Sequence, residues 1–191
     1  MNEALSLMAE LRRVLDHARI PFCLGGSWAS TLHGQPRQTL DIDLIVEMKE
    51  PDIAPLLAAV PSNLYVSAGA VREAVASHRS FNIIDPATGM KADCFVRGEA
   101  PFDLEEFARR RVRQISAQAG LSVPVKSPED SILRKLSWYR DGGCVSEHQW
   151  RDVLGVLAVN AGGLDAAYLD RWAAELEIAD LLERARGESS R

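Results

Sequence analysis

The amino-acid sequence predicts an α+β fold, in which a small mixed β-sheet is flanked by helices and followed by a helical C-terminal part. Two observations support this prediction. Between residues 20 and 125, short apolar runs alternate with turn-forming segments, whereas the last third of the chain shows helical periodicity and helix-start signals. The chain has 191 residues, of which 47% are hydrophobic, enough for one medium-sized domain with an extension. We expect an α/β core over residues 1–125 and a helical part over 126–191 packed on it.

The elements of the core are predicted from apolar periodicity and from turn residues. Residues 3–19 place apolar side chains at helical spacing, which predicts an amphipathic helix. The apolar run 22–24 ends at Gly25-Gly26, which predicts a strand that enters a tight turn. Residues 85–89 are rich in turn formers and predict a β-hairpin between two strands. The remaining expected elements are strands over 41–46, 81–84, 91–96, 112–116 and 121–125, and helices over 27–32, 52–60, 70–78 and 102–110.

The C-terminal third carries explicit helix-start signals. Ser127 precedes a proline and two acids, a pattern typical of an N-cap and first helical turn, so a helix to about Arg140 is expected. Residues 146–149 form a capping-box pattern that opens another helix. Further helices are expected over 165–176 and 178–185, with a frayed tail over 187–191.

The strongest functional signal is a glycine pair followed by two spaced acids. Gly25-Gly26-Ser27 precedes Asp41 and Asp43 by about fifteen residues. Residues i and i+2 of a strand lie on the same face, about 7 Å apart, so both carboxylates can face one site. Two carboxylates held this close repel each other unless a cation lies between them. Mg²⁺ (or Mn²⁺) is the natural candidate, because it prefers oxygen ligands and shares its coordination shell with substrate phosphates.

The glycine turn and Asp93 complete the predicted site. Backbone N–H groups of Gly25 and Gly26 at the start of a short helix can bind a phosphate, and Ser27 can add a hydroxyl donor. Asp93 lies in the middle of an apolar strand, where an acid lowers stability unless it is ligated or paired. In a two-metal reaction, Asp93 would help to activate the attacking hydroxyl while Asp41 and Asp43 bridge the ions.

Each of these features also has a plainer interpretation. A Gly-Gly pair can be only a turn, an Asp-x-Asp can be a solvated strand end, and Asp93 can be an edge-strand acid that faces water. Their occurrence together, in this order and on strands of suitable spacing, favours a metal site.

Residues 25–46, GGSWASTLHGQPRQTLDIDLIV, resemble the nucleotidyltransferase (DNA polymerase β-like) superfamily. Over roughly residues 20–160 the sequence is most similar to the AbiEii/MenT-type toxins of type IV toxin–antitoxin systems and their bacterial relatives. The resemblance implies a nucleotide-binding Arg37 before the Asp-x-Asp, a functional Lys135 on a downstream helix, and a functional Asp152 in a later Arg-Asp pair. It also implies transfer of a nucleoside monophosphate from a nucleoside triphosphate to a hydroxyl of an RNA, protein or small molecule, and a possible cognate antitoxin.

Several of these side chains allow two interpretations. Lys135 can reach nucleotide phosphates, or it can be a solvated helix lysine. Asp152 can orient Lys135 or Arg151, or it can form a surface pair with Arg151. Arg37 can bind a phosphate or fix its loop. The basic run over 109–113 can contact an RNA backbone, or it can complement the dipole at a helix C-terminus.

Composition narrows the possible classes of function. The net charge of −5 argues against nucleic-acid binding by bulk charge, and three widely spaced cysteines argue against a zinc site or a disulfide framework. We expect no membrane-spanning segment or secretory signal, and a cytoplasmic location. The leading hypothesis is an active nucleotidyltransferase. The alternatives are a catalytically silent nucleotide-binding or regulatory module of the same fold, and an antibiotic-modifying enzyme.

Overall fold

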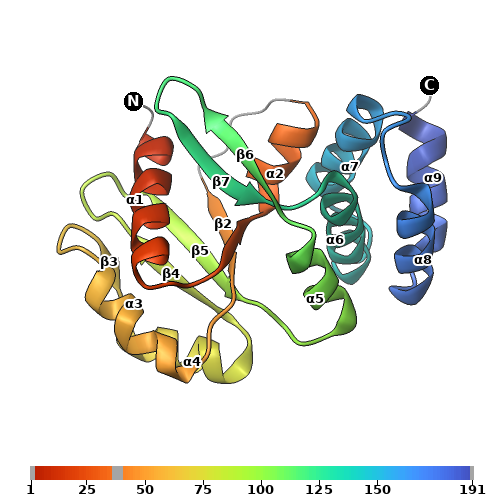
Figure 1. The fold of residues 1–191 in the computed structure, drawn as a ribbon. Coiled ribbons are helices and arrows are strands. Elements are labelled where there is room, and N and C mark those ends of the chain that lie inside the picture. The colour runs from red at the N-terminus through yellow and green to blue at the C-terminus, as the bar shows by residue number, and fades with distance from the viewer. Residues whose placement is uncertain (1–2, 36–40, 190–191) are drawn as a thin grey trace. The chain divides into compact units, whose positions relative to one another are not determined.

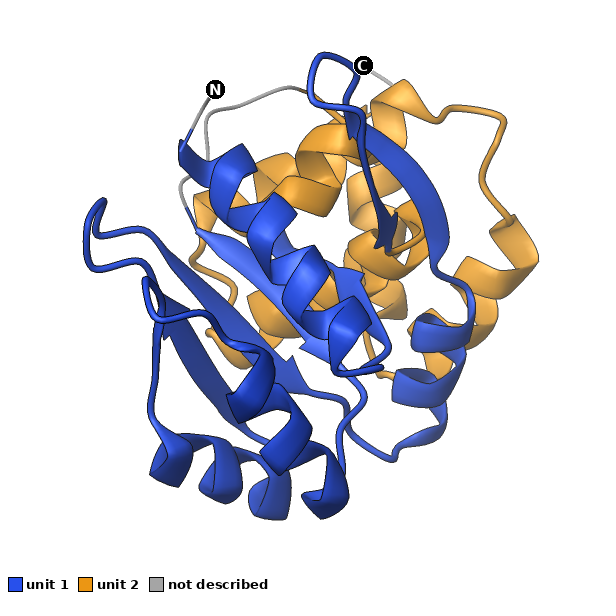
Figure 2. Cartoon of the chain, turned by 60° about the vertical axis from the view of Figure 1, so that its left-hand side comes forward, with its two compact units in different colours: residues 1–26, 39–125 blue, residues 27–38, 126–191 orange. Residues whose placement is uncertain are grey.

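The computed structural model describes residues 3–35 and 41–189, which form two compact units. Unit 1 comprises residues 1–26 and 39–125, and unit 2 comprises residues 27–38 and 126–191, as far as they are described (Figure 2). Each unit is considered by itself below. The expected division into domains over 1–125 and 126–191 stays a prediction.

Unit 1 is built on a mixed β-sheet. Seven strands of the described residues follow one another in the order β3-β4-β5-β2-β1-β7-β6 (Figure 1). Strand β2 is antiparallel to β1 but parallel to β5, and β1 is parallel to β7, so the sheet mixes both kinds of pairing. This confirms the predicted α+β class. The strands are β1 (Phe22–Leu24), β2 (Ile42–Val46), β3 (Tyr65–Val66), β4 (Ser80–Ile84), β5 (Lys91–Val96), β6 (Arg111–Ser116) and β7 (Leu121–Val125).

Helices α1, α3 and α4 lie on one side of this sheet (Figure 1). Helix α1 buries a stripe of apolar residues that recur every three or four positions, including Leu7, Leu11 and Leu15, so burial of this face holds the helix on the sheet. The helices of unit 1 are α1 (Glu3–His17), α3 (Ile53–Ala59), α4 (Ala68–Ser77) and α5 (Pro101–Ala108), with a 3₁₀ turn, η1 (Glu50–Asp52).

Strand β2 alternates between buried and partly exposed positions. Ile42, Leu44 and Val46 are completely buried, whereas Asp43 and Ile45 between them are partly exposed. Because successive side chains of a strand point to opposite faces, the apolar residues and Asp43 lie on different faces of the sheet. The strand therefore presents its acid away from the apolar core to which it contributes.

Unit 2 is helical, and the predicted N-caps are confirmed. The Ser127 hydroxyl accepts a hydrogen bond from the Asp130 amide, and the Ser146 hydroxyl accepts one from the Gln149 amide. The helices are α2 (Gly26–His33), which begins at the last residue of unit 1, α6 (Pro128–Asp141), α7 (Glu147–Val159), α8 (Ala166–Glu175) and α9 (Ala179–Ser189). The expectation of a frayed tail is wrong for residues 187–189, because α9 continues through Ser189.

The predicted hairpin is present, but its second strand has an additional partner. Strands β4 and β5 pair antiparallel as expected, and β5 also pairs parallel with β2, which lies far from it in the sequence. Elements β3 and η1 were not expected, because two- and three-residue segments carry almost no periodicity. Within residues 3–35 and 41–189, no helix has the length and apolar character needed to cross a membrane.

Candidate carboxylate site

The parallel pairing of β2 with β5 places two of the predicted acids side by side. Asp43 and Asp93 are direct register partners on these strands. Adjacent strands lie about 4.8 Å apart, and paired residues point to the same face, so both carboxylates project from one face of the sheet. Asp41 immediately precedes β2 and lies two residues before Asp43, which assigns it to that face as well. The three acids therefore line one end of two neighbouring strands.

Asp93 already has donors within unit 1. The Lys91 ammonium group lies 3.0 Å from Asp93 Oδ2 and 3.2 Å from Oδ1, so it contacts both carboxylate oxygens. On the neighbouring strand β4, Asn82 is the register partner of Asp93. In the amide orientation that satisfies both of its ends, Asn82 Nδ2 donates to Asp93 Oδ1 at 2.8 Å. An acid in this strand is thus tolerated because it is paired.

The charge of Lys91 is coupled to all three acids. Its hydrogen bond to Asp93 raises the pKa of the ammonium group above its ordinary value. Partial desolvation opposes this rise in pKa, and the charges of Asp93, Asp41 and Asp43 add to it. Lys91 is therefore a cation at neutral pH, and its charge interacts favourably with the charges of all three acids.

The glycine turn lies directly against Asp43. Gly26 has a φ of +52°, a left-handed conformation that glycine adopts without strain. A Cβ atom added at Gly26 would lie 1.7 Å from Asp43 Oδ2, so only glycine leaves room for this carboxylate. The Gly25 amide donates to the Asp43 carbonyl oxygen at 2.9 Å and is thus engaged inside the sheet. The predicted phosphate-binding role of Gly25, Gly26 and Ser27 stays a prediction.

The donor set suits a hard divalent cation that also binds substrate. In the part of the chain that the structure describes, no group of three His, Cys, Asp or Glu side chains stands ready to enclose a metal ion. Mg²⁺ does not require such a cage, because it usually binds one or two carboxylates together with waters and substrate phosphates. The Asp43–Asp93 pair with Asp41 beside it supplies carboxylate oxygens of this kind, and Lys91 now occupies the oxygens of Asp93.

Two further predicted residues meet each other in unit 2. The Lys135 ammonium group lies 2.8 Å from Asp152 Oδ2 and donates to Gln149 Oε1 at 3.0 Å. The two charged side chains are 5% and 10% exposed, so they form a buried ion pair between α6 and α7. Arg151 instead lies 3.8 Å from Glu147 at the surface. Among the interpretations left open, the structure thus favours Asp152 orienting Lys135. Ser27 also belongs to unit 2, and Arg37 lies outside the described residues.

Sequence reasoning did not find Lys91 or Asn82. A signal for Lys91 was present, because residues two apart on a strand share a face and Lys91 lies two positions before Asp93. Asn82 carries no such signal, since its contact depends on the register between two strands.

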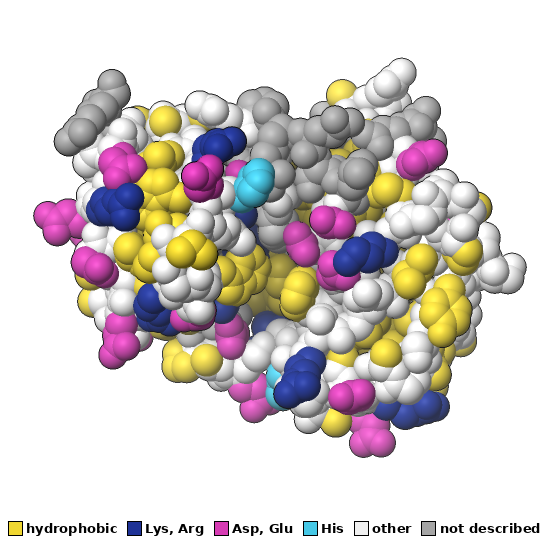
Figure 3. Space-filling model, turned by 180° about the vertical axis from the view of Figure 1, so that it is seen from behind, with side chains coloured by type: hydrophobic (Ala, Val, Ile, Leu, Met, Phe, Trp, Pro, Cys, Tyr) yellow, Lys and Arg dark blue, Asp and Glu magenta, His cyan; other side chains and the backbone are white. Residues whose placement is uncertain are grey.

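The basic run over 109–113 divides between two environments. Arg109 is the C-cap of α5, and Arg110 donates to the Phe107 carbonyl oxygen at 2.5 Å while its guanidinium lies 4.0 Å from the Phe107 ring. Arg111 and Arg113 are exposed on β6. The interpretation as a helix end therefore fits the first two arginines only. Over the face drawn in Figure 3, acidic and basic side chains are interspersed among the described residues, without a broad basic area.

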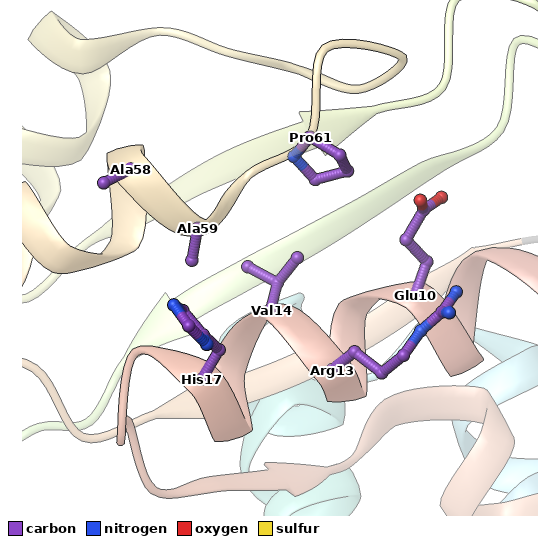
Figure 4. A pocket seen from close by; sticks show the side chains of 7 residues that line it. All are labelled: Glu10, Arg13, Val14, His17, Ala58, Ala59 and Pro61. Carbon is purple, nitrogen blue, oxygen red and sulfur yellow. The ribbon is translucent and has the colours of Figure 1, made fainter.

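Unit 1 also contains a cavity of about 390 Å³ between α1 and α3, with a charged rim and an apolar floor (Figure 4). Its lining comprises Glu10, Arg13, Val14, His17, Ala58, Ala59 and Pro61. None of these residues belongs to the predicted site, so the cavity is separate from the carboxylates.

The chain has the nucleotidyltransferase fold, because solved nucleotidyltransferases match it over most of their length. The antibiotic-resistance factor ANT(2″)-Ia, solved with adenylyl-2″-tobramycin, matches with a TM-score of 0.58 and 18% identity over 91% of this chain and 96% of that chain. An antigenic nucleotidyltransferase-like protein from Paracoccidioides brasiliensis matches with a TM-score of 0.58 and 20% identity over 97% and 93% of the two chains. The lincosamide antibiotic adenylyltransferase LnuA, bound to lincomycin, matches with a TM-score of 0.50 and 11% identity over 83% and 98%.

Comparison of the sequence itself gives no match to a protein-family model or to a curated protein. At these identities the structural likeness establishes the fold. The predicted superfamily fold is therefore confirmed, and the closer resemblance to AbiEii/MenT-type toxins stays a prediction.

Proposed function

We propose that this chain is a Mg²⁺-dependent nucleotidyltransferase that moves a nucleoside monophosphate from a nucleoside triphosphate to a hydroxyl acceptor. The observation that carries the proposal is the register pairing of Asp43 with Asp93 on parallel strands, with Asp41 at the start of the first strand. Adjacent carboxylates on one face repel each other unless a cation holds them together. Support also comes from the nucleotidyltransferase fold of the chain.

In this proposal each residue has a defined task. Asp43 and Asp93 would hold a divalent ion, Asp41 would add an oxygen ligand, and Gly26 leaves the space in which the Asp43 carboxylate lies. When bound there, Mg²⁺ would supply positive charge to the triphosphate and would lower the pKa of the attacking hydroxyl. The hydroxyl oxygen forms a bond to the α-phosphorus, the bond to pyrophosphate breaks, and the hydroxyl proton leaves towards Asp93.

Two different kinds of support suggest candidate acceptors. The resemblance to AbiEii/MenT-type proteins favours an RNA or protein acceptor and a toxin role with a cognate antitoxin. The structural neighbours ANT(2″)-Ia and LnuA were solved with adenylyl-2″-tobramycin and with lincomycin, which makes small hydroxyl-bearing antibiotics candidate acceptors too. All of these acceptors present a hydroxyl group, so one assay can compare them.

A catalytically silent nucleotide-binding or regulatory module is the second candidate function. One observation favours it: Lys91 already neutralises Asp93 within the protein, so this one carboxylate does not depend on a metal ion for its charge balance. Such a module would bind a nucleotide without transferring it.

A transfer assay separates the two candidates. Each of the four nucleoside triphosphates, labelled at the α-phosphate, is incubated with Mg²⁺ and with RNA, protein, tobramycin or lincomycin. We expect pyrophosphate release and label on at least one acceptor class, and neither with the Asp41→Asn/Asp43→Asn variant. Nucleotide binding without release of pyrophosphate from the nucleotide, whichever acceptor is present, would favour the silent module.

A further inference from the structure

The Lys91 side chain contacts the carboxylate oxygens of Asp93 that would have to bind a metal ion. Its ammonium group contacts both oxygens of Asp93, at 3.0 and 3.2 Å. Asn82 donates to Oδ1 of the same carboxylate in its satisfied orientation. A divalent ion that binds Asp93 needs at least one of these oxygens, and its positive charge would be repelled by the ammonium group that already contacts them.

The exposure of Lys91 allows its ammonium group to move away from Asp93. Its side chain is 44% exposed, compared with 21% for Asp93, so the ammonium group can move into water without crossing the protein interior. An ion pair whose cation is this exposed to solvent contributes little stability, so a divalent ion that binds the same carboxylate can replace it. Asp93 is therefore held within the sheet, while the long side chain of Lys91 extends partly into solvent.

We propose that Lys91 is a built-in counter-ion that holds Asp93 while no metal is bound and that an incoming divalent ion displaces. The inference rests on the proposed function, since it concerns the metal site of that reaction. Before it is displaced, Lys91 acts as a positioning residue. It keeps the Asp93 carboxylate oriented and reduces the repulsion between Asp93 and Asp43, which are neighbours in register. The same contact lowers the affinity of the free protein for metal, so a triphosphate that contributes its own oxygens to the ion favours the displaced state.

Removing the ammonium group tests this proposal directly. In the Lys91→Met variant, Mn²⁺ has no competing cation and meets less positive charge, so we expect it to bind roughly 3- to 10-fold more tightly. Mn²⁺ binding to the protein without nucleotide is measured by electron paramagnetic resonance. Lys91→Arg keeps the positive charge and should not bind Mn²⁺ more tightly than the wild type. Lys49→Met removes the same charge beyond the opposite end of β2 and should also leave Mn²⁺ affinity unchanged.

The outcomes distinguish this proposal from the proposed function. If Lys91→Met binds Mn²⁺ no more tightly than the wild type, while Asp43→Asn loses binding, the displacement of Lys91 is contradicted and the metal site stands. An equal increase in Mn²⁺ affinity in Lys91→Met and Lys49→Met would show that the effect comes from the change in net charge alone, and would also overturn the proposal. A purely structural ion pair would lower the unfolding temperature of Lys91→Met without changing its Mn²⁺ affinity. Absence of Mn²⁺ binding in both the wild type and Lys91→Met would overturn the inference and the proposed metal site together.

Discussion

Replacement of Lys135 with methionine is expected to lower the free energy of unfolding by about 3–5 kcal/mol, the cost of breaking a buried ion pair from one side. The variant leaves the Asp152 carboxylate, only 10% exposed, without the ammonium group that now lies 2.8 Å away. It also removes the donor to Gln149 Oε1. Urea denaturation followed by circular dichroism measures the change.

A double variant shows whether this cost comes from the unpaired charge. In Lys135→Met/Asp152→Leu, no buried charge of the pair remains, so most of the lost stability should return. If the double variant is as unstable as the sum of the single variants, Lys135 and Asp152 do not stabilise unit 2 as a pair. Nucleotide binding by the stable double variant then tests the predicted phosphate-binding role of Lys135. Unchanged affinity would assign Lys135 to structure alone.

The second large effect is expected at Gly26. An alanine there must adopt a φ of +52°, which costs about 1–2 kcal/mol for an L-residue. Its Cβ would also lie 1.7 Å from Asp43 Oδ2 and 2.7 Å from Asp43 Cβ, so rotation of the carboxylate alone does not relieve the clash. We therefore expect Gly26→Ala both to destabilise the protein and to move Asp43, which weakens metal-dependent nucleotide binding.

Gly120 provides a matched control for the cost of placing an alanine at a positive φ. Its φ is +59°, close to that of Gly26, but an added Cβ would meet no atom within 4 Å. Gly120→Ala should therefore show the conformational cost without the clash. The clash should make Gly26→Ala less stable than Gly120→Ala by a further ~1–3 kcal/mol, the usual cost of overpacking. Equal stability of the two variants, with unchanged nucleotide binding, would show that Gly26 does not shape the site.

The local elements of the fold were predictable because each carries its own chemical signal. The apolar stripe of α1, the serine caps of α6 and α7, and the turn between β4 and β5 are all readable from neighbouring residues. The parallel pairing of β2 with β5 was not, because it joins segments about fifty residues apart, and no local pattern encodes such a register. The short elements β3 and η1 escaped prediction for want of periodicity.

The same division applies to the site. Asp41, Asp43 and Asp93 could be proposed from acids placed where strands are otherwise apolar, but only the sheet register makes Asp43 and Asp93 neighbours. Lys135 and Asp152 were selected by resemblance as functional residues, and their contact between α6 and α7 adds a structural role. Lys91 was not predicted, and its significance depends on the acid that it contacts.

We propose above that Asp43 and Asp93, with Asp41, bind a divalent ion together with a nucleoside triphosphate. Isothermal titration calorimetry with a non-hydrolysable nucleoside triphosphate tests it most directly, with and without Mg²⁺, on the wild type and on Asp41→Asn/Asp43→Asn. Both substitutions preserve side-chain size, so circular dichroism should show an intact fold. We expect Mg²⁺-dependent binding by the wild type and no detectable binding by the double variant. Binding of equal strength in the folded double variant, or no binding of any of the four nucleotides to the wild type, would contradict it.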